Sequence, residues 1–432
     1  MDIKDYADIK DYADKVWRGA ADDSIVHTGM GGSGVIEIAD GLGWQPGFGN
    51  VIAFRGRDEL VLFDTGNQLT AASLHDRIRA WTSDPLTLAF YSHGHIDHVM
   101  GMGPFDAEEG PRPQVVAHEL VRDRFDRYAL TAGYNSVINQ RQFQSPGLRW
   151  PTEYRQPDVT YREALTVTRA GLTFDLFHAK GETDDATVAY VPEYGLLLPG
   201  DLFIWLTPNC GNPQKVQRYP REWAHALRRM AALGAEIMMP SHGAPVFGAD
   251  RIAQALTETA EWLESIIDQT LAMLNEGRRL DDVVHAVTPP AHLSDRVYLR
   301  ARYDEPEFIV RNLWRLYGGW YDGNPAHLKP ARDADLARAV TALAGGAAKV
   351  ADAARRAADG GDLRLAAHLA EMAVQADPGD ASLHEVRAEV YAARAEAEPS
   401  LMATGVFTWA ANESRSATGG TGAPSTLPDL MG

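Results

Sequence analysis

The chain has 432 residues, 45% of them hydrophobic, with 59 acidic against 41 basic side chains, 14 histidines and a single cysteine, Cys210. This length provides for two or three domains with an ample core, and one cysteine excludes both an intramolecular disulfide framework and a thiolate-rich metal site. The net charge of −18 argues against nucleic acid as a partner, because nucleic-acid binding depends on Lys and Arg that neutralise phosphates.

The N-terminal residues are polar and acidic. The hexapeptide of residues 2–7 recurs as residues 8–13, so we expect residues 1–30 to form a polar helical lead-in or to carry a duplication without function. No run of 18 apolar residues occurs, which predicts no membrane span, and no apolar segment of a secretion signal stands at the start. These features predict a cytoplasmic protein.

From about residue 31, glycine-rich turns separate short apolar runs. Strands are predicted over residues 50–54, 60–63, 86–91, 114–117, 173–177, 187–191, 195–198 and 236–239. Helical patterns over 70–81 and 221–233 lie between them. Strands that alternate with helices favour an α/β architecture. The long insertion over residues 119–151 lacks strong periodicity, which predicts a lid or a substrate loop.

Beyond residue 250 the pattern is helical. A long amphipathic helix is predicted over 252–275, and the alanine-rich stretch 333–398 breaks at 359–362 and 377–380. Those breaks predict helix ends followed by Asp N-caps. The helices resemble tetratricopeptide-type hairpins, too few to stand alone, so we expect them to pack on another surface such as a second subunit. Residues 412–432 have the composition of a disordered tail.

The densest group of ionisable side chains follows the apolar run 86–90. His93, His95, Asp97 and His98 place three imidazoles and a carboxylate within six residues. Because side chains alternate, His93 and His95 can face one point while Asp97 and His98 face a second. Nitrogen and oxygen ligands in this arrangement suit two divalent ions, with zinc the leading candidate.

Four further segments stand at predicted strand ends: Phe63-Asp64-Thr65-Gly66, Gly181-Glu182-Thr183, Pro199-Gly200-Asp201 and Pro240-Ser241-His242-Gly243. Together with the His-x-His-x-Asp-His segment, and in the same order, they resemble the motifs of the metallo-β-lactamase superfamily. The resemblance spans about residues 31–247. It implies an αββα sandwich.

One departure narrows the resemblance. The superfamily pattern has Gly-His-Thr where this chain has Gly181-Glu182-Thr183, and the alkylsulfatase branch, the type III sulfatases, shares that glutamate. Residues 316–328, Leu-Tyr-Gly-Gly-Trp-Tyr-Asp-Gly-Asn-Pro-Ala-His-Leu, look like the Asp-Gly-Asn-Pro segment of the alkylsulfatase dimerisation domain. The resemblance therefore implies a catalytic domain over 31–275, an all-α dimerisation domain over 276–411, and a homodimer.

The resemblance also implies a binuclear site with two Zn²⁺ per chain. The implied ligands are His93, His95 and Glu182 for the first ion, Asp97, His98 and His242 for the second, and Asp201 as the bridge. Asp97 and Asp64 are the predicted catalytic residues, Asp64 by orienting a ligand histidine or the loop backbone. A strand-end cap is the alternative for Asp64. His178 is an alternative to Glu182, and Asp184 and Asp185 are more remote ones.

The ligand charges bear on the substrate. Two Zn²⁺ with three carboxylates leave a bare charge of about +1, which a bridging hydroxide reduces to zero. A site with histidine in place of Glu182 would be one unit more positive. We therefore expect a small-molecule substrate that is monoanionic or neutral and has an apolar part, such as a sulfate monoester. The metals would lower the pKa of a shared water from about 15.7 toward 7. Attack on sulfur and attack on carbon both remain open.

The resemblance does not extend to the residues that contact the substrate. Alkylsulfatases supply a sulfate-binding arginine from a Leu-Arg-Gly-Ala stretch that is absent here. Asn209, Lys215 and Arg218 are candidates to replace it, although a lysine does not reproduce the fork of an arginine and Arg218 could instead be a salt-bridged surface residue. Further pocket candidates are Phe203, Trp205 and Leu206, with Tyr134, Asn135 and Arg141 from the insertion.

The sequence thus predicts a binuclear zinc hydrolase that uses a metal-bridging hydroxide to cleave sulfate esters of organic alcohols. One alternative is a metallohydrolase acting on a lactone, a carboxylic ester or a phosphoester. Others are a helical interaction scaffold with a residual metal domain, and a mononuclear iron oxygenase of the same fold. The complete second ligand set argues against the last two.

Overall fold

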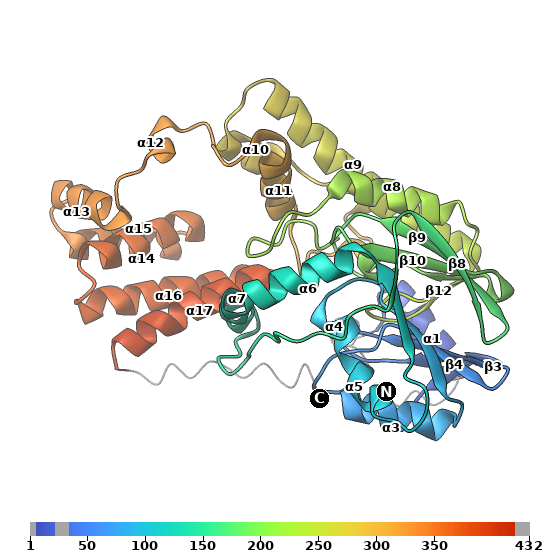
Figure 1. The fold of residues 1–432 in the computed structure, drawn as a ribbon. Coiled ribbons are helices and arrows are strands. Elements are labelled where there is room, and N and C mark those ends of the chain that lie inside the picture. Colours follow the sequence, from blue (N-terminus) through green and yellow to red (C-terminus); the bar gives the residue numbers. More distant parts are fainter. Residues whose placement is uncertain (1–5, 22–33, 420–432) are drawn as a thin grey trace.

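The computed structural model describes residues 6–21 and 34–419. Two β-sheets pack face to face, helices cover their outer faces, and a helical domain follows (Figure 1). The predicted αββα sandwich followed by an all-α domain is confirmed.

The first sheet has seven strands in sequence order. They are β1 (Ile36–Ala39), β2 (Leu42–Gln45), β3 (Val51–Gly56), β4 (Glu59–Phe63), β5 (Leu86–Phe90), β6 (Gln114–His118) and β7 (Val159–Tyr161). The strands from β1 to β4 pair antiparallel, and those from β4 to β7 pair parallel. Because β4 and β5 are parallel neighbours, both strands end at the same edge of the sandwich.

The second sheet has six strands in the order β13-β12-β11-β10-β9-β8. They are β8 (Ala164–Arg169), β9 (Leu172–Ala179), β10 (Ala186–Val191), β11 (Leu196–Leu198), β12 (Ile237–Met238) and β13 (Val246–Phe247). Only β11 and β12 pair parallel within this sheet. The eight predicted strands are all present; β1, β2, β7, β8 and β13 were not predicted.

Apolar side chains from the two sheets form one core between them. Phe174 of β9 contacts Phe54 of β3 edge to face at 5.0 Å between ring centroids and Phe90 of β5 at 5.1 Å. A second core lies between the first sheet and its covering helices. Burial on both faces explains why the central strands read as continuous apolar runs.

The helices of the sandwich are α3 (Ala71–Trp81), α4 (Ile96–Val99), α5 (Gly103–Asp106), α6 (Leu120–Leu130), α7 (Ala132–Phe143), α8 (Pro220–Ala231) and α9 (Ala249–Asn275). Helices α6 and α7 occupy the insertion for which no regular structure was predicted. The hydrophobic pattern of this segment does not predict α7, because the helix buries the polar side chains of Asn139 and Gln142.

The N-terminal helix α1 (Tyr6–Trp17) carries the second hexapeptide copy. Ile9, Tyr12 and Val16 are buried in the core between the sheets, so this segment is amphipathic rather than polar throughout. The first copy lies largely outside the described residues.

The C-terminal domain contains α10 (Leu280–Ala286), α11 (Pro306–Gly318), α12 (Pro325–Leu328), α13 (Asp333–Leu343), α14 (Ala347–Asp359), α15 (Leu363–Ala376), α16 (Ala381–Ala397) and α17 (Leu401–Ala417). The predicted N-caps are confirmed, since Asp362 and Asp380 accept hydrogen bonds from Leu365 N and Ser382 N. Helix α17 continues to Ala417, which corrects the expectation of disorder from residue 412, because its inner face packs on α16 and α7. Residues 420–432 lie outside the described part.

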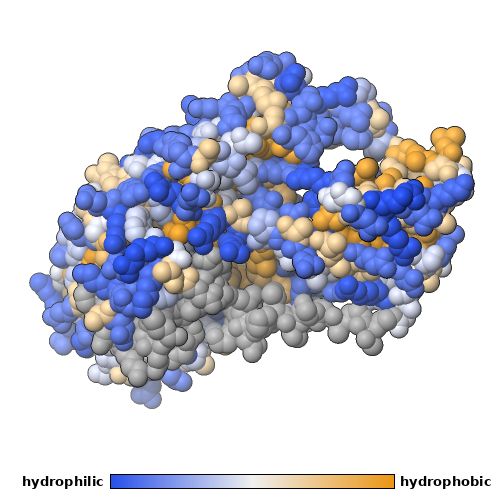
Figure 2. Space-filling view, turned by 180° about the vertical axis from the view of Figure 1, so that it is seen from behind, coloured by the Kyte–Doolittle hydropathy of each residue, from blue (hydrophilic) through white to orange (hydrophobic). Residues whose placement is uncertain are grey.

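No helix in the described ranges combines the length and the apolar character that crossing a membrane requires. Figure 2 shows a largely hydrophilic back face, with apolar residues gathered at the end where the C-terminal helices lie.

Candidate metal centre

The predicted ligands meet at one edge of the sandwich. Asp64 directly follows β4, the segment 93–98 follows β5, Glu182 lies in the β9–β10 turn, Asp201 follows β11 and His242 lies between β12 and β13. The two sheets thereby bring motifs up to 178 residues apart in the chain to one place. Side chains at strand ends are free to converge because no ladder pairing holds their backbone.

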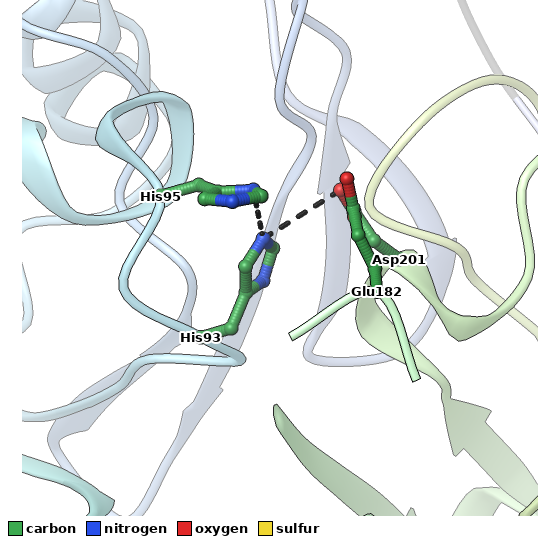
Figure 3. Close-up of side chains that lie close together, drawn as sticks. All are labelled: His93, His95, Glu182 and Asp201. Atoms are coloured by element: carbon green, nitrogen blue, oxygen red, sulfur yellow. Dashed lines mark hydrogen bonds and ion pairs between the residues drawn. The ribbon is translucent and has the colours of Figure 1, made fainter. Parts of the chain in front are cut away.

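Four of these residues form a first cluster, drawn in Figure 3: His93, His95, Glu182 and Asp201. The His93 and His95 rings approach to 2.8 Å between Nε2 and Nδ1, and His93 Nε2 lies 3.6 Å from Asp201 Oδ2. Glu182 and Asp201 face the two imidazoles from the second sheet (Figure 3). One ligand atom from each residue lies within 4.8 Å of the others.

Asp97, His98 and His242 form a second cluster beside the first. Asp97 Oδ2 lies 3.4 Å from His98 Nε2 and 3.5 Å from His242 Nε2. Asp201 Oδ2 also faces this cluster, at 3.6 Å from His98 Nε2 and 3.2 Å from His242 Nε2. Asp201 thus lies between the two clusters, as the predicted bridging role requires.

Asp64 is fully buried and organises the base of the site. Its carboxylate accepts hydrogen bonds from Ser92 N at 2.7 Å, from Ser241 Oγ at 2.8 Å and from Ser92 Oγ, and it contacts His98 Nδ1 at 2.9 Å. Its backbone has a φ of 61°, in the left-handed region that is uncommon for residues other than glycine. Asp64 therefore positions both ligand-bearing loops, which favours the predicted orienting role over a strand-end cap.

Glu182 is held by two of the predicted substrate contacts. The Arg218 guanidinium lies 2.6 Å from Glu182 Oε1, and the Asn209 amide donates to the same oxygen. Arg218 Nη1 also donates to the backbone oxygens of Asn209 and Glu182. Both side chains line the cavity described below, so their predicted contact with substrate stays a prediction beside their contacts with Glu182. Arg218 is only 4% exposed, which corrects the alternative of a surface salt bridge.

His178 does not compete for the Glu182 position. Its ring stacks on His118 at 3.8 Å between centroids, and its Nε2 contacts Asp184 O at 2.8 Å, outside both clusters.

Burial and neighbouring charges shift the pKa values of three predicted ligands. Burial lowers the pKa of His93 to about 4, aided by His98. Burial also acts to lower the pKa of His242, but the Asp201 and Asp97 carboxylates outweigh it and raise that pKa to about 9. Burial raises the pKa of Glu182 to about 7 even though Arg218 opposes it. Positive charge is therefore favoured at the second cluster, where it balances the Asp97 and Asp201 carboxylates.

The donor set fits a pair of divalent metal ions. His98 Nδ1 is taken by Asp64, while His98 Nε2 and Asp201 Oδ1 are buried with no hydrogen-bond partner. Burying such atoms costs folding free energy unless they bind a metal ion or form hydrogen bonds. A neutral imidazole whose second nitrogen contacts a carboxylate is the usual arrangement of a metal ligand. The residues present thus fit the implied metals.

A buried ion pair missed in the sequence supports the His93–His95 turn. Asp185 Oδ2 accepts from Arg124 Nε at 2.7 Å and from Gly94 N at 3.1 Å, and Asp184 also pairs with Arg124. Asp184 and Asp185 therefore do not reach the metal clusters. Arg124 lies in α6, within the insertion, and no local sequence signal connects it to this turn.

A cavity of about 540 Å³ opens over both clusters. Among the predicted contacts, Trp205, Leu206, Asn209, Lys215 and Arg218 line it. Its apolar wall includes Phe48, Phe143 and Trp150.

Four predicted pocket residues do not line this cavity. Tyr134 is 63% exposed, the Asn135 amide donates to Thr131 in its own helix, and Arg141 donates to Gln214. Phe203 is buried against the rings of Trp205 and Tyr298. Tyr134, Asn135 and Arg141 were misassigned because the register of α7, which turns these side chains away, was not recognised.

Two family models match the chain. The "Metallo-beta-lactamase superfamily" model matches residues 44–242, and the "Alkyl sulfatase dimerisation" model matches residues 279–417.

Curated relatives agree with these matches. A linear primary-alkylsulfatase of Pseudomonas sp. is 28% identical over 358 residues, which cover 77% of this chain and 67% of the relative. An (R)-specific secondary-alkylsulfatase of Pseudomonas sp. is 24% identical, with coverage of 79% and 56%. An alkyl/aryl-sulfatase of Saccharomyces cerevisiae is 23% identical, with coverage of 82% and 60%. The chain thus spans between about half and two thirds of the length of these relatives.

Among solved structures, the stereoselective inverting sec-alkylsulfatase Pisa1 from Pseudomonas sp. matches with a TM-score of 0.79 and 22% identity, over 92% of this chain and 66% of that one. This likeness supports the fold. The chain is thus similar to the metallo-β-lactamase superfamily over residues 44–242 and to the alkylsulfatase dimerisation family over residues 279–417.

Proposed function

We propose that this protein is a binuclear zinc hydrolase that cleaves sulfate esters of organic alcohols. The observation that carries the proposal is the pair of adjoining ligand clusters with Glu182 among them, at the base of a cavity with an apolar wall. The similarity to alkylsulfatases over both domains supports sulfate esters as the substrate class.

Two zinc ions bound here would supply Lewis acidity toward the ester oxygens and activate a water at neutral pH. The protein side chains do the rest. The Asp64 carboxylate contacts His98 Nδ1, which would leave Nε2 available to hold a metal, and the Asn209 and Arg218 side chains hold the Glu182 carboxylate in place. Asp97 lines the cavity and belongs to the second cluster, so it is placed to bind a metal and to face the substrate.

Lys215 is the candidate to receive the anionic part of the substrate. Its ammonium donates to Asn139 Oδ1 at 3.1 Å and lies 5.2 Å from the centre of the Trp150 ring, with no carboxylate in salt-bridge contact with it among the described residues. The aromatic and aliphatic wall beside it can bury the organic part of the ester.

The Arg218 contact changes the expected charge of the site. Glu182 with Arg218 is neutral as a pair, as a histidine in the same position would be, so the deficit of one charge attributed to the glutamate is cancelled. A preference for monoanionic over dianionic substrates therefore rests on the single charge of Lys215 and not on Glu182. Sulfate monoesters remain the proposed class.

The test is turnover of zinc-loaded protein on a panel of primary and secondary alkyl sulfates, with release of inorganic sulfate as the readout. Sulfate release from at least one member, abolished in the His95→Ala variant, is the expected result. Absence of turnover on every member would overturn the proposal. Reaction in ¹⁸O-labelled water then separates attack on sulfur, which labels the sulfate, from attack on carbon, which labels the alcohol.

A second candidate is hydrolysis of lactones, carboxylic esters or phosphoesters. The ion pair of Arg218 Nη1 with Glu182 favours it, because Arg218 is the one arginine among the described residues that line the cavity and part of its guanidinium is already paired. The same panel extended to these esters decides between the two. The scaffold alternative is disfavoured because all seven predicted ligands are assembled.

A further inference from the structure

One wall of the cavity belongs to a segment that the C-terminal domain holds in place. Residues 143–148 contribute an unbroken run to the cavity lining, and Asn139 and Trp150 extend it on either side. We call residues 139–150 the pocket wall. It comprises the end of α7 and the turn that follows.

The backbone of the pocket wall is held in a costly conformation. Gln144 has a φ of 52° and a ψ of 35°, in the left-handed region that is unfavourable for a residue with a Cβ. Its side-chain amide is buried and donates to Arg141 O and to Gly405 O, each at 2.6 Å. The bond to Gly405 therefore ties this turn to α17, which lies 261 residues further along the chain.

The backbone of α17 lies so close to the pocket wall that there is no room for a Cβ atom at Gly405. A Cβ added at Gly405 would lie 2.3 Å from the carbonyl oxygen of Gln142 and 3.0 Å from its Cα. Both neighbours are backbone atoms, which cannot turn aside as a flexible side chain can. Gly405 is thus required by this contact, although glycine weakens a helix by about 1 kcal/mol relative to alanine.

A second contact joins the same wall to the segment before α11. Gln142 Nε2 and the Tyr303 hydroxyl lie 2.8 Å apart, and Tyr303 itself lines the cavity. The start of α17 is fixed to that segment as well, by Leu401 N donating to Arg302 O at 2.9 Å and by Ser400 Oγ bonding to Glu305. Figure 1 shows α7 lying against α17.

We propose that α17 determines the shape of the substrate pocket by holding the pocket wall through Gly405, so that Gly405 is a positioning residue outside the metal-binding domain. Gly405 touches no predicted ligand and acts only through Gln142 and Gln144. The part of the proposal that concerns substrate rests on the proposed function, whereas the mechanical part does not.

The experiment compares Gly405→Ala with Gly379→Ala in the full-length, zinc-loaded protein. Gly379 lies in the same domain, and a Cβ there would meet only Asp377 Oδ1 at 3.9 Å, so it is a matched control. Hydrogen exchange read by mass spectrometry should be about tenfold faster over residues 139–150 in Gly405→Ala. It should be unchanged over residues 86–98 in both variants, and unchanged throughout in Gly379→Ala.

Kinetics supply the second readout. We expect Gly405→Ala to raise KM for esters with long organic groups about tenfold, to leave KM for the smallest ester nearly unchanged, and to keep kcat and zinc content. Should Gly405→Ala fail to fold, Gln144→Ala removes the hydrogen bond to Gly405 O from the other side, and the same faster exchange over residues 139–150 is expected for it.

Unchanged exchange over 139–150 would overturn the proposal. Faster exchange with equal effects on KM for all esters would overturn the claim about pocket shape. If no ester is turned over at all, the exchange data still decide whether α17 holds the wall, so failure of the proposed function is distinguishable from failure of this inference.

Discussion

Arg218 and Glu182 form a buried ion pair, 2.6 Å between the guanidinium and the carboxylate, with exposed fractions of 4% and 6%. Burying two charges costs free energy that only close contact and further hydrogen bonds can offset. Here those bonds are made by Asn209 and by two backbone oxygens. The pair therefore holds a predicted metal ligand in position.

Arg218→Met should leave the Glu182 carboxylate buried without its cation. We expect zinc affinity at the first cluster to fall about 10- to 100-fold and the free energy of unfolding to fall by about 3–5 kcal/mol. Titration with a competing zinc chelator and urea unfolding measure the two effects. Arg218→Lys restores the charge but not the fork, so intermediate values are expected for it. Parent-like zinc binding in Arg218→Met would contradict the role assigned to the pair.

His95→Ala should reduce the zinc content from about two ions per chain to about one, because the first cluster loses one of two imidazoles. The control is His225→Ala, since His225 is exposed on α8 and belongs to neither cluster. Elemental analysis of protein purified without chelator is the measurement. Equal zinc content in the two variants would exclude the first cluster as a metal site. Removal of all zinc by a chelator should abolish turnover, and added zinc should restore it.

The ligand residues could be predicted from the sequence because each lies in a short contiguous motif beside a strand. The residues that support them could not. Arg218 and Glu182 are 36 positions apart, and Arg124 and Asp185 are 61 apart, and nothing in the local pattern of either segment specifies the other. Helix α7 was missed for a related reason. It buries Asn139 and Gln142, whose partners Lys215 and Tyr303 come from distant segments. The sequence of α7 therefore shows no apolar stripe from which its buried face could be predicted.

Asp304, which is not among the predicted ligands, should give the stability of the protein a measurable pH dependence. Burial raises the pKa of this carboxyl from 3.8 to about 7, although Gly211 N and Glu305 N donate to it. The folded protein then keeps this proton up to about pH 7, while the unfolded chain releases it near pH 4. The stabilisation is therefore full below about pH 4, falls as the pH rises, and is lost above about pH 7.

Urea unfolding at pH 5 and pH 8 checks this dependence. Between these values the parent should lose about 2–3 kcal/mol more than Asp304→Asn, which has no proton to release. The variant also loses a hydrogen-bond acceptor, so only the change between the two pH values is compared. An equal change in both proteins would show that Asp304 ionises in the folded state as it does in the unfolded chain.

The exposed apolar residues of α13 and α15 should form part of a dimer interface. Leu343, Leu336 and Leu365 are 90%, 50% and 48% exposed, in the domain that matches the alkylsulfatase dimerisation family. Exposed apolar groups gathered in this way mark association surfaces. Light scattering should give the mass of two chains, and Leu343→Asp should raise the dimer dissociation constant about tenfold or more. Leu69→Asp, which changes an equally apolar side chain on the metal-binding domain, should leave the mass unchanged.

Lys215 should make anion binding depend on pH. Burial, with a smaller contribution from Arg218, lowers the pKa of this ammonium to about 7, so it is charged below that pH and neutral above it. Inhibition by inorganic sulfate should therefore weaken as the pH rises from 6 to 8. In Lys215→Met the inhibition constant should be about tenfold higher at pH 6 and should change less with pH, because the remaining dependence comes from the metal site. Lys215→Arg keeps its charge throughout this range and should bind sulfate at pH 8 better than the parent does. Since all three proteins share the same metal ligands, the differences between them isolate the contribution of residue 215. An identical pH profile in the parent and Lys215→Met would show that sulfate is bound without this side chain.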